Sequence, residues 1–293
     1  MPLVRVNACG DRPKPVDDLG ATLRALPEGA PVIALVHGYK YAPGHARRCP
    51  HDHILSLHPR AAPRAMSWPR HLGFGRGDPD EGLCIAFGWN ASGSLWTAHA
   101  EAERAGRALA ELIGTLRSRR LAPAHVVAHS LGARVALGAF AQLPEDAIGR
   151  ALLLAGAETR AGAEAALATP AGRTAEIVNV RTRENTLFDL LFRAAIHPHR
   201  LRARTLGAGL GRDDRRWVDL RIDCPATRAH LAFRGFRIPP PARAVCHWSA
   251  YLRPGLFPLY RALLREVLPL PALRVPACPT DFSAAPPLPE PAV

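Results

Sequence analysis

Residues 124–134 read AHVVAHSLGAR and join a short apolar strand directly to a helix of small residues, which we expect from Ala133 to Phe140. Ser130 stands at the junction. A sharp strand-to-helix turn holds such a serine in a strained backbone conformation and exposes its hydroxyl above the sheet. The usual pattern is G-x-S-x-G, because bulky side chains would collide across the turn. Ala128 replaces the first glycine and is the next smallest residue, so the segment predicts an exposed serine nucleophile.

Buried strands and helices alternate along the rest of the chain. Continuous apolar runs, typical of strands buried on both faces of a parallel sheet, lie at 31–36, 83–87 and 151–156. A further strand is expected at 175–180, and an alternating, edge-like strand at 217–222. Helical patterns lie at 95–119, 161–168, 187–195 and 256–268. This alternation predicts the α/β class, with a doubly wound, mostly parallel sheet flanked by helices.

Length and composition predict one domain over residues 1–270. The chain has 293 residues, of which 48% are hydrophobic, and this is enough for one large core. A long loop insertion is expected at residues 39–80, which are irregular and rich in Pro, His, Arg and Gly. Residues 271–293 are rich in proline, so we expect an extended or disordered tail.

The formal net charge of +13 raises the question of nucleic-acid binding. Lys14 and Lys40 are the only lysines, and the many arginines are dispersed rather than gathered into a stripe, so no nucleic-acid partner is expected. The charge leaves an acidic substrate or an anionic surface open. No apolar run approaches about 18 residues, and no secretory signal is recognisable at the N-terminus. We therefore expect no membrane span, a cytoplasmic location and reduced cysteines.

A serine nucleophile needs a histidine base, and the base is expected late in the chain when the order is serine, acid, histidine. His247 lies just before the last predicted helix and is the preferred base. His197 and His199 directly follow the helix after the expected acid, which is too early, and His230 precedes a further apolar segment.

The acid that orients the histidine should follow the strand at 175–180. Glu184 lies in the turn straight after this strand and is the preferred candidate. Asp189 lies about one turn into the next helix, but it stays the runner-up because Asp is the commoner triad acid. Asp219 and Asp223, on the last strand, are outside candidates.

An oxyanion hole needs two backbone N–H groups near the serine. The first is expected from Leu131, which follows the serine, and the second from the loop after the first central strand. Gly38 permits a tight turn in that loop, so the N–H of Tyr39 or Lys40 could face the site. His37 is expected to bond backbone in this loop.

Together these residues resemble the α/β-hydrolase superfamily, and more specifically its bacterial esterase/lipase-like members. The resemblance covers roughly residues 30–268 and is carried by HGY at 37–39, AHSLGAR at 128–134, NVRTREN at 179–185 and CHW at 246–248. It implies a Ser-His-acid catalytic triad that hydrolyses a carboxylic ester, or a related acyl bond, of a small-molecule substrate through an acyl-enzyme without a cofactor. Two features depart from the family's usual pattern, namely Ala128 for glycine and Glu184 for aspartate.

Two other functions fit the same sequence. One is acyl transfer to an acceptor other than water, and the other is a non-catalytic binding protein on a hydrolase scaffold. The run at 49–58 contains metal-ligand residue types, but its spacing matches no zinc template, so no metal is expected. We interpret it as a loop beside or over the mouth of the site. The aromatic residues at 67–75 line the acyl pocket or anchor the loop, and Arg134 binds a substrate carboxylate or is paired structurally.

Overall fold

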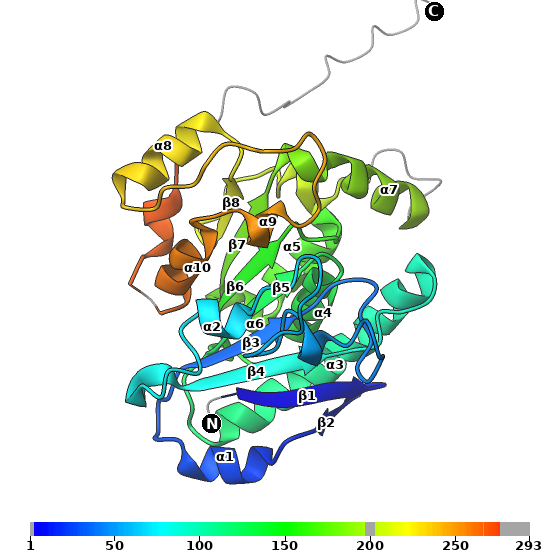
Figure 1. The fold of residues 1–293 in the computed structure, drawn as a ribbon, viewed down its shortest axis with the longest axis vertical. Coiled ribbons are helices and arrows are strands. Elements are labelled where there is room, and N and C mark those ends of the chain that lie inside the picture. The colour runs from blue at the N-terminus through cyan, green and yellow to red at the C-terminus, as the bar shows by residue number, and fades with distance from the viewer. Residues whose placement is uncertain (1–2, 197–202, 266, 276–293) are drawn as a thin grey trace, which may run out of the picture.

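The computed structural model describes residues 3–196, 203–265 and 267–275. An eight-stranded sheet lies at its centre in the order β2-β1-β4-β3-β5-β6-β7-β8 (Figure 1). The strands are β1 Leu3–Cys9, β2 Arg12–Pro15, β3 Val32–Val36, β4 Leu83–Gly88, β5 Ala124–His129, β6 Ile148–Leu154, β7 Glu176–Arg181 and β8 Trp217–Arg221. β2 pairs with β1 in antiparallel fashion, and the other pairings in this sheet are parallel.

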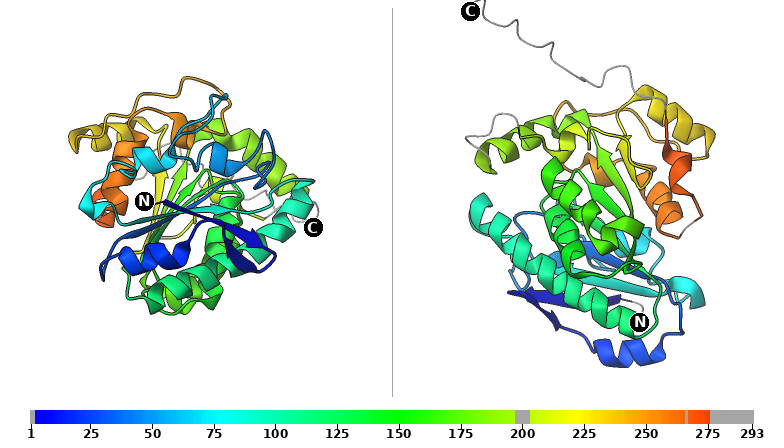
Figure 2. Two further views of the ribbon diagram at one scale, coloured as in Figure 1. Left: turned by 60° about the horizontal axis from the view of Figure 1, so that its bottom comes forward. Right: turned by 180° about the vertical axis from the view of Figure 1, so that it is seen from behind.

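Helices cover both faces of the sheet, as Figures 1 and 2 show from opposite sides. One face packs against α1, α3, α4, α5 and α6, and the other against α2, α8, α9 and α10. In the described residues the helices are α1 Leu19–Ala25, α2 Trp68–His71, α3 Leu95–Ser118, α4 Gly132–Ala139, α5 Arg160–Ala168, α6 Pro170–Thr174, α7 Thr186–Ile196, α8 Pro225–Phe233, α9 Ser249–Leu252 and α10 Leu256–Leu264. The predicted doubly wound α/β class is confirmed.

Strand β3 shows why the apolar runs are continuous. Val32 and Val36 belong to the hydrophobic cluster on one face of the sheet, whereas Ile33 and Leu35 belong to the cluster on the other. Successive side chains of a strand point to opposite faces, so a strand covered by helices on both sides must be apolar at every position. All five side chains of β3 are buried.

Residues 39–80 are more ordered than the composition predicts. They contain α2 and the 3-10 turns η1 Pro50–Asp52 and η2 Pro79–Glu81. Ile54, Trp68 and Leu72 are fully buried against the second face of the sheet. Burial of these large apolar side chains fixes the insertion to the core, which a count of loop-forming residues does not reveal.

Several expectations are corrected at the level of single elements. The last helix ends at Leu264 rather than 268, and α8 and the strand β2 outside β1 were not predicted. Cys224 is disulfide-bonded, so reduced thiols do not hold at that position. Leu270, the last residue of the expected domain, and Leu273, in the expected tail, are buried on the second face. Residues 276–293 lie outside the described residues. Across the described ranges, no helix combines the length and apolarity that a bilayer span requires.

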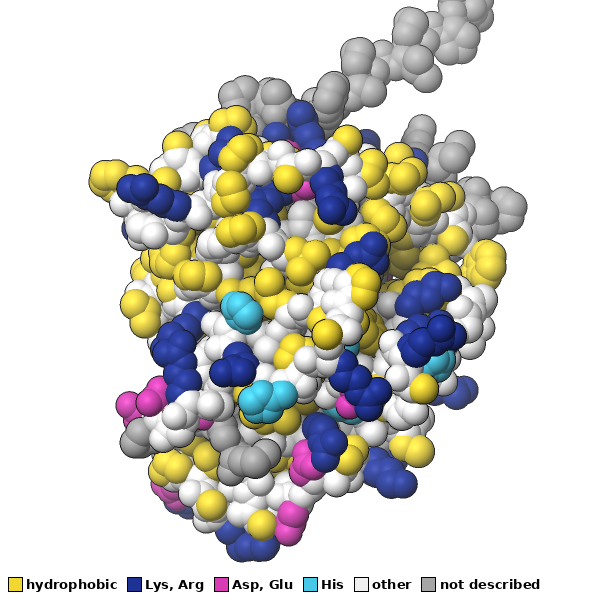
Figure 3. All heavy atoms as spheres, in the orientation of Figure 1, with side chains coloured by type: hydrophobic (Ala, Val, Ile, Leu, Met, Phe, Trp, Pro, Cys, Tyr) yellow, Lys and Arg dark blue, Asp and Glu magenta, His cyan; other side chains and the backbone are white. Residues whose placement is uncertain are grey.

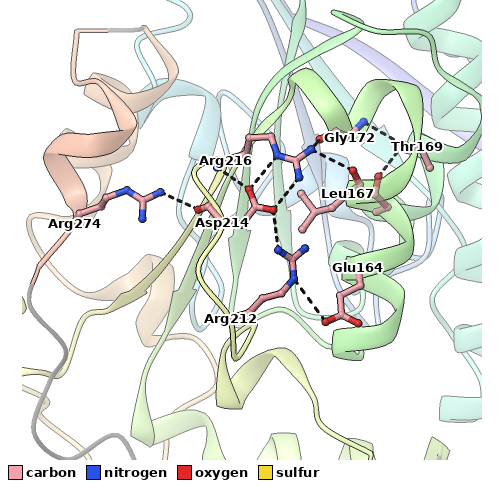
Figure 4. Close-up of polar contacts among 9 residues, drawn as sticks. Glu164, Leu167, Thr169, Gly172, Arg212, Asp214, Arg216 and Arg274 are labelled. Carbon is pink, nitrogen blue, oxygen red and sulfur yellow. Dashed lines mark hydrogen bonds and ion pairs between the residues drawn. The ribbon is translucent and has the colours of Figure 1, made fainter.

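A network around Asp214 holds the connection that leads into β8 (Figure 4). The Asp214 carboxylate accepts from Arg216 at 2.8 Å and from Arg212 at 3.1 Å, and its backbone carbonyl accepts from Arg274 at 2.8 Å. Arg216 also donates to the carbonyl of Gly172 at the other side of the network, 2.7 Å away. The hydrogen bond from the Arg216 guanidinium holds the pKa of the Asp214 carboxyl far below its usual range. Asp214 therefore joins three parts of the chain: its carboxylate holds Arg216, which reaches α6, and its backbone carbonyl holds Arg274 in the last described segment.

We predict that Asp214→Asn lowers the free energy of unfolding by about 1–2 kcal/mol at pH 7, because Arg216 and Arg212 lose a charged acceptor whose side chain is only 6% exposed. Asp213→Asn, at the exposed neighbouring position, is the matched control. Urea unfolding of the three proteins measures the difference. Equal stability of the two variants would contradict a structural role for this network.

Candidate active site

Ser130 sits in a strained turn between β5 and α4. Its φ is +53°, a left-handed conformation that costs a non-glycine residue on the order of 1 kcal/mol or more. Three backbone hydrogen bonds hold the turn. The Ser130 N–H donates to Leu154 at 3.0 Å, and its carbonyl accepts from Ala133 at 3.0 Å and from Ala157 at 2.9 Å. The strained conformation of Ser130 is therefore held by β6, by the chain just after β6 and by α4.

Two glycines let the loop after β3 pack against this turn. A Cβ on Gly38 would lie 2.8 Å from both the Ser130 Cβ and the His129 carbonyl oxygen. A Cβ on Gly132 would lie 2.5 Å from the His37 carbonyl oxygen. Larger residues at either position would push the loop and the serine turn apart. Ala128 is fully buried at the position where glycine is usual, so its methyl group fits there.

His247 lies against the serine, as predicted. Its Nε2 is 2.8 Å from the Ser130 Oγ, and its Nδ1 is 2.6 Å from the Oδ1 of Asn185. An amide oxygen can only accept, so the Nδ1 carries the ring proton and donates it to Asn185. The Nε2 lone pair is then free to accept from the serine hydroxyl. The histidine is in the tautomer that a base for Ser130 requires.

Glu184, the preferred acid, does not contact His247. Its carboxylate forms an ion pair with Arg253 and accepts from the Thr182 hydroxyl at 3.1 Å. Both ion-pair side chains are almost fully buried. The position expected for Glu184 is taken by the next residue, Asn185. The two lie in the 3-10 turn η4 Arg183–Asn185, where successive side chains point about 120° apart, so only one of them can face the histidine.

The backbone of Glu184 still contributes to the site. Its carbonyl accepts from the Cys246 N–H at 2.8 Å, immediately before the histidine. Arg253 also donates to the carbonyl of Ile222 at 2.8 Å, so the buried ion pair joins the ends of β7 and β8 to helix α9. Glu184 therefore positions the loop that carries His247.

The other candidate acids and bases are also engaged elsewhere. Asp189 accepts from the Thr205 hydroxyl at 2.5 Å, and burial raises the pKa of its carboxyl. Asp219 accepts from Asn179, Trp217 and the backbone of Leu210, and Asp223 forms an ion pair with Arg221. His230 donates to the carbonyl of Ala272 at 2.8 Å. His197 and His199 lie outside the described residues.

The backbone N–H groups expected to face an oxyanion are that of Leu131 and that of either Tyr39 or Lys40. The Lys40 N–H donates to the carbonyl of Ala91 at 2.9 Å, so it is already hydrogen-bonded. Within the described part of the chain, the N–H groups of Leu131 and Tyr39 have no such acceptor. Both residues line the cavity that contains Ser130. The N–H groups of Leu131 and Tyr39 therefore stay the candidates for an oxyanion hole.

Of the histidines around the serine, His37 and His129 are buried and His247 is partly buried. Burial, with a further contribution from the neighbouring His129, lowers the pKa of His247 well below its ordinary value. Burial lowers the pKa of His129 to about 4 and that of His37 to about 3. His37 donates to the carbonyl of Gly38 at 2.9 Å and accepts from the Trp89 N–H at 3.0 Å, so it bonds backbone as predicted.

A cavity of about 610 Å³ opens beside Ser130 and His247. Leu95 of α3 and Phe188, Leu191 and Phe192 of α7 form an apolar wall. The loop insertion supplies another part of the lining, including Tyr41. Trp68 and Phe74 do not line this cavity but are buried in the core, so the aromatic residues at 67–75 anchor the loop.

The remaining polar candidates have structural partners. Arg134 donates to Glu158 at 2.9 Å, so it is paired at the start of α4. His51 contacts the Asn7 side chain and His53 the Tyr41 hydroxyl, each at 2.7 Å. In the described residues, no group of three His, Cys, Asp or Glu side chains is placed to hold a metal ion.

No known protein-family model and no curated protein sequence matches this chain.

Neutral buried histidines predict that the fold loses stability in mild acid. The unfolded chain binds a proton at each histidine near pH 6.5, whereas folded His37, His129 and His247 do not, so acid favours the unfolded state. Each such histidine lowers the free energy of unfolding by up to about 1.4 kcal/mol per pH unit below 6.5. Urea unfolding between pH 7.5 and pH 5.5 measures this slope.

His129→Asn should reduce the slope, because one titrating group is removed. His58→Asn, which changes an exposed histidine, is the control. A wild-type stability that is flat or rises between pH 7.5 and pH 5.5 would show that these histidines are protonated in the folded protein.

Proposed function

We propose that this protein is a serine hydrolase that cleaves a carboxylic ester, or a related acyl bond, through an acyl-enzyme. The observation that carries the proposal is the 2.8 Å contact between Ser130 Oγ and His247 Nε2, made on a strained turn. The serine follows β5, its histidine follows β8, and the residue that orients the histidine follows β7. This order is the one used by α/β-hydrolases, which supports a place among their esterase/lipase-like members.

In the proposed reaction His247 accepts the proton of Ser130 as the serine oxygen attacks the substrate carbonyl. The N–H groups of Leu131 and Tyr39 stabilise the negative charge that develops on the carbonyl oxygen. His247 then gives the proton to the leaving alcohol, and the acyl-enzyme forms. A water molecule, deprotonated by the same nitrogen, hydrolyses the acyl-enzyme and returns Ser130 to its starting state.

Asn185 replaces the expected carboxylate as the residue that orients His247. Its amide oxygen fixes the ring in the required tautomer, but it brings no negative charge to stabilise the imidazolium that forms during attack. The base is therefore held neutral by burial and remains competent in mild acid. We propose Ser130, His247 and Asn185 as the catalytic group, with Glu184 as a positioning residue.

The first test is reaction with a fluorophosphonate probe, which labels activated serines. Wild-type protein should be labelled, and Ser130→Ala and His247→Ala should abolish labelling. Ser118→Ala, at an exposed serine at the end of α3, should leave it intact. A folded wild-type protein that resists labelling would favour a binding protein on the same scaffold. In labelled protein, an alcohol acceptor that diverts product from acid to ester would favour acyl transfer.

A second test separates Asn185 from Glu184. Asn185→Ala should lower kcat for p-nitrophenyl hexanoate by about 100-fold, because the histidine loses its orienting partner. Asn185→Asp should move the acidic limb of the kcat/KM profile to higher pH, because a nearby carboxylate raises the pKa of His247. Wild-type kcat/KM should stay level from pH 8 to pH 6.

Glu184→Gln should instead act on stability. It leaves the buried Arg253 without its charged partner and should lower the free energy of unfolding by about 3 kcal/mol. The acidic limb of the kcat/KM profile should stay at the same pH as in the wild-type protein. If Glu184→Gln moved the limb and Asn185→Ala had no effect on kcat, the carboxylate first expected from the sequence would be the partner of His247.

A further inference from the structure

Four basic side chains gather around the cavity that holds Ser130. Lys40, Arg47, Arg48 and Arg64 all come from the loop insertion, line the cavity, and are exposed. Among the residues that the structure describes, none of the four forms an ion pair with a carboxylate, whereas arginines elsewhere often do, such as Arg134. Figure 3 shows how basic side chains outnumber acidic ones across one face of the molecule. These four basic side chains lie around one cavity, whereas the other basic residues of the chain are dispersed.

The contacts of these side chains leave N–H donors available to a ligand. The Arg64 guanidinium lies over the ring of Trp248, with its carbon 3.4 Å from the ring centroid. Stacking uses the face of a guanidinium and leaves its edge of N–H groups free. Arg48 contacts the Nε2 of His45 at 2.9 Å, and the Lys40 ammonium lies 4.7 Å from the centre of the Tyr39 ring.

Arg64 is also placed close to the reaction centre. The residue on which it stacks, Trp248, directly follows the base, and the rings of the two lie 5.9 Å apart. A group held by Arg64 would therefore be a neighbour of an ester bound at Ser130.

The same cavity also has an apolar part. Leu95, Phe188, Leu191 and Phe192 face it from α3 and α7. Of the described residues that line the cavity, Asp189 alone is acidic, and it already accepts from Thr205. A negatively charged ligand thus meets several cations and little opposing charge, and an apolar segment of the same ligand can pack on the side chains from α3 and α7.

We propose that the substrate of this site is an amphiphilic ester that carries an oxyanion group, a carboxylate or a phosphate, together with an apolar chain. The inference rests on the proposed hydrolase function and adds the substrate class to it. Arginine forks match the geometry of both oxyanions, and a cluster of exposed cations attracts them over a distance set by the ionic strength.

Two pairs of closely matched esters test the proposal. Mono-p-nitrophenyl adipate and p-nitrophenyl hexanoate differ in an anionic group on the acyl side. The acetate esters of 3-(4-hydroxyphenyl)propanoate and of 4-propylphenol differ in one on the alcohol side. In at least one pair, kcat/KM should be about ten-fold higher for the anionic ester, and added salt should reduce the preference. Inhibition by pentanoate, butyl phosphate and pentanol distinguishes carboxylate from phosphate recognition.

Substitutions locate the preference on the loop. Arg47→Gln and Arg64→Gln should each lower the ratio of anionic to neutral kcat/KM by about three- to ten-fold, because each removes one exposed cation. Arg104→Gln, on the exposed side of α3, is the matched control and should keep the ratio. A ratio near one in both pairs, or a ratio that survives combined substitution of Arg47, Arg48 and Arg64, would overturn the inference.

Binding to Ser130→Ala separates this inference from the proposed reaction. In at least one of the two pairs, calorimetry on this variant should give a lower Kd for the anionic ester than for its neutral counterpart, without any turnover. If the fluorophosphonate labels the protein but anionic esters are not preferred over neutral ones, the inference on substrate class is overturned while the proposed hydrolase function stands. If the wild-type protein resists labelling but the anionic ester binds more tightly, the proposed hydrolase function is overturned while the anion-binding site stands.

Discussion

The left-handed turn at Ser130 is the constraint on which the rest of the site depends. The serine can keep its φ of +53° only while β6 accepts its N–H and α4 and the chain after β6 donate to its carbonyl. The loop after β3 must also approach closely, and the glycines at 38 and 132 allow it. Because β3, β5 and β6 are adjacent in the sheet, one strained residue is fixed by three central elements at once.

The chemistry around this turn is that of an uncharged, buried site. His247 has an amide rather than a carboxylate on its Nδ1, and the neighbouring His129 and His37 are held neutral by burial. Glu184, which precedes Asn185 in the chain, is neutralised by Arg253 and ties the histidine loop to the sheet. Orientation and charge are thus divided between adjacent residues, with Asn185 fixing the tautomer and Glu184 fixing the loop.

The loop insertion connects the core to the mouth of the site. Its apolar residues, such as Ile54 and Trp68, are buried against the sheet, while its basic residues lie around the cavity. A loop that is anchored in this way can present charges at constant positions, because the entropy of ordering it is offset by the burial of its apolar side chains. This is the physical basis for expecting the insertion to select among esters.

The sequence by itself determined the class of fold and the two residues that meet at the centre of the site. Apolar runs such as 31–36 predicted strands covered on both faces, and the pattern around Ser130 predicted a sharp turn into a helix. The order of the strands then required a late histidine, and His247 is the one that contacts the serine. Tertiary structure alone decided the partner of that histidine. Glu184 and Asn185 are neighbours in one tight turn, and the sequence favours the residue with the charge. Arg253, just after α9, forms an ion pair with the Glu184 carboxylate, and the Asn185 amide faces His247 instead. The Lys40 N–H, one of the expected oxyanion donors, is likewise bonded to the carbonyl of Ala91, a distant residue that becomes its neighbour only in the folded chain. Such choices depend on contacts between residues far apart in sequence, and local patterns carry no record of them.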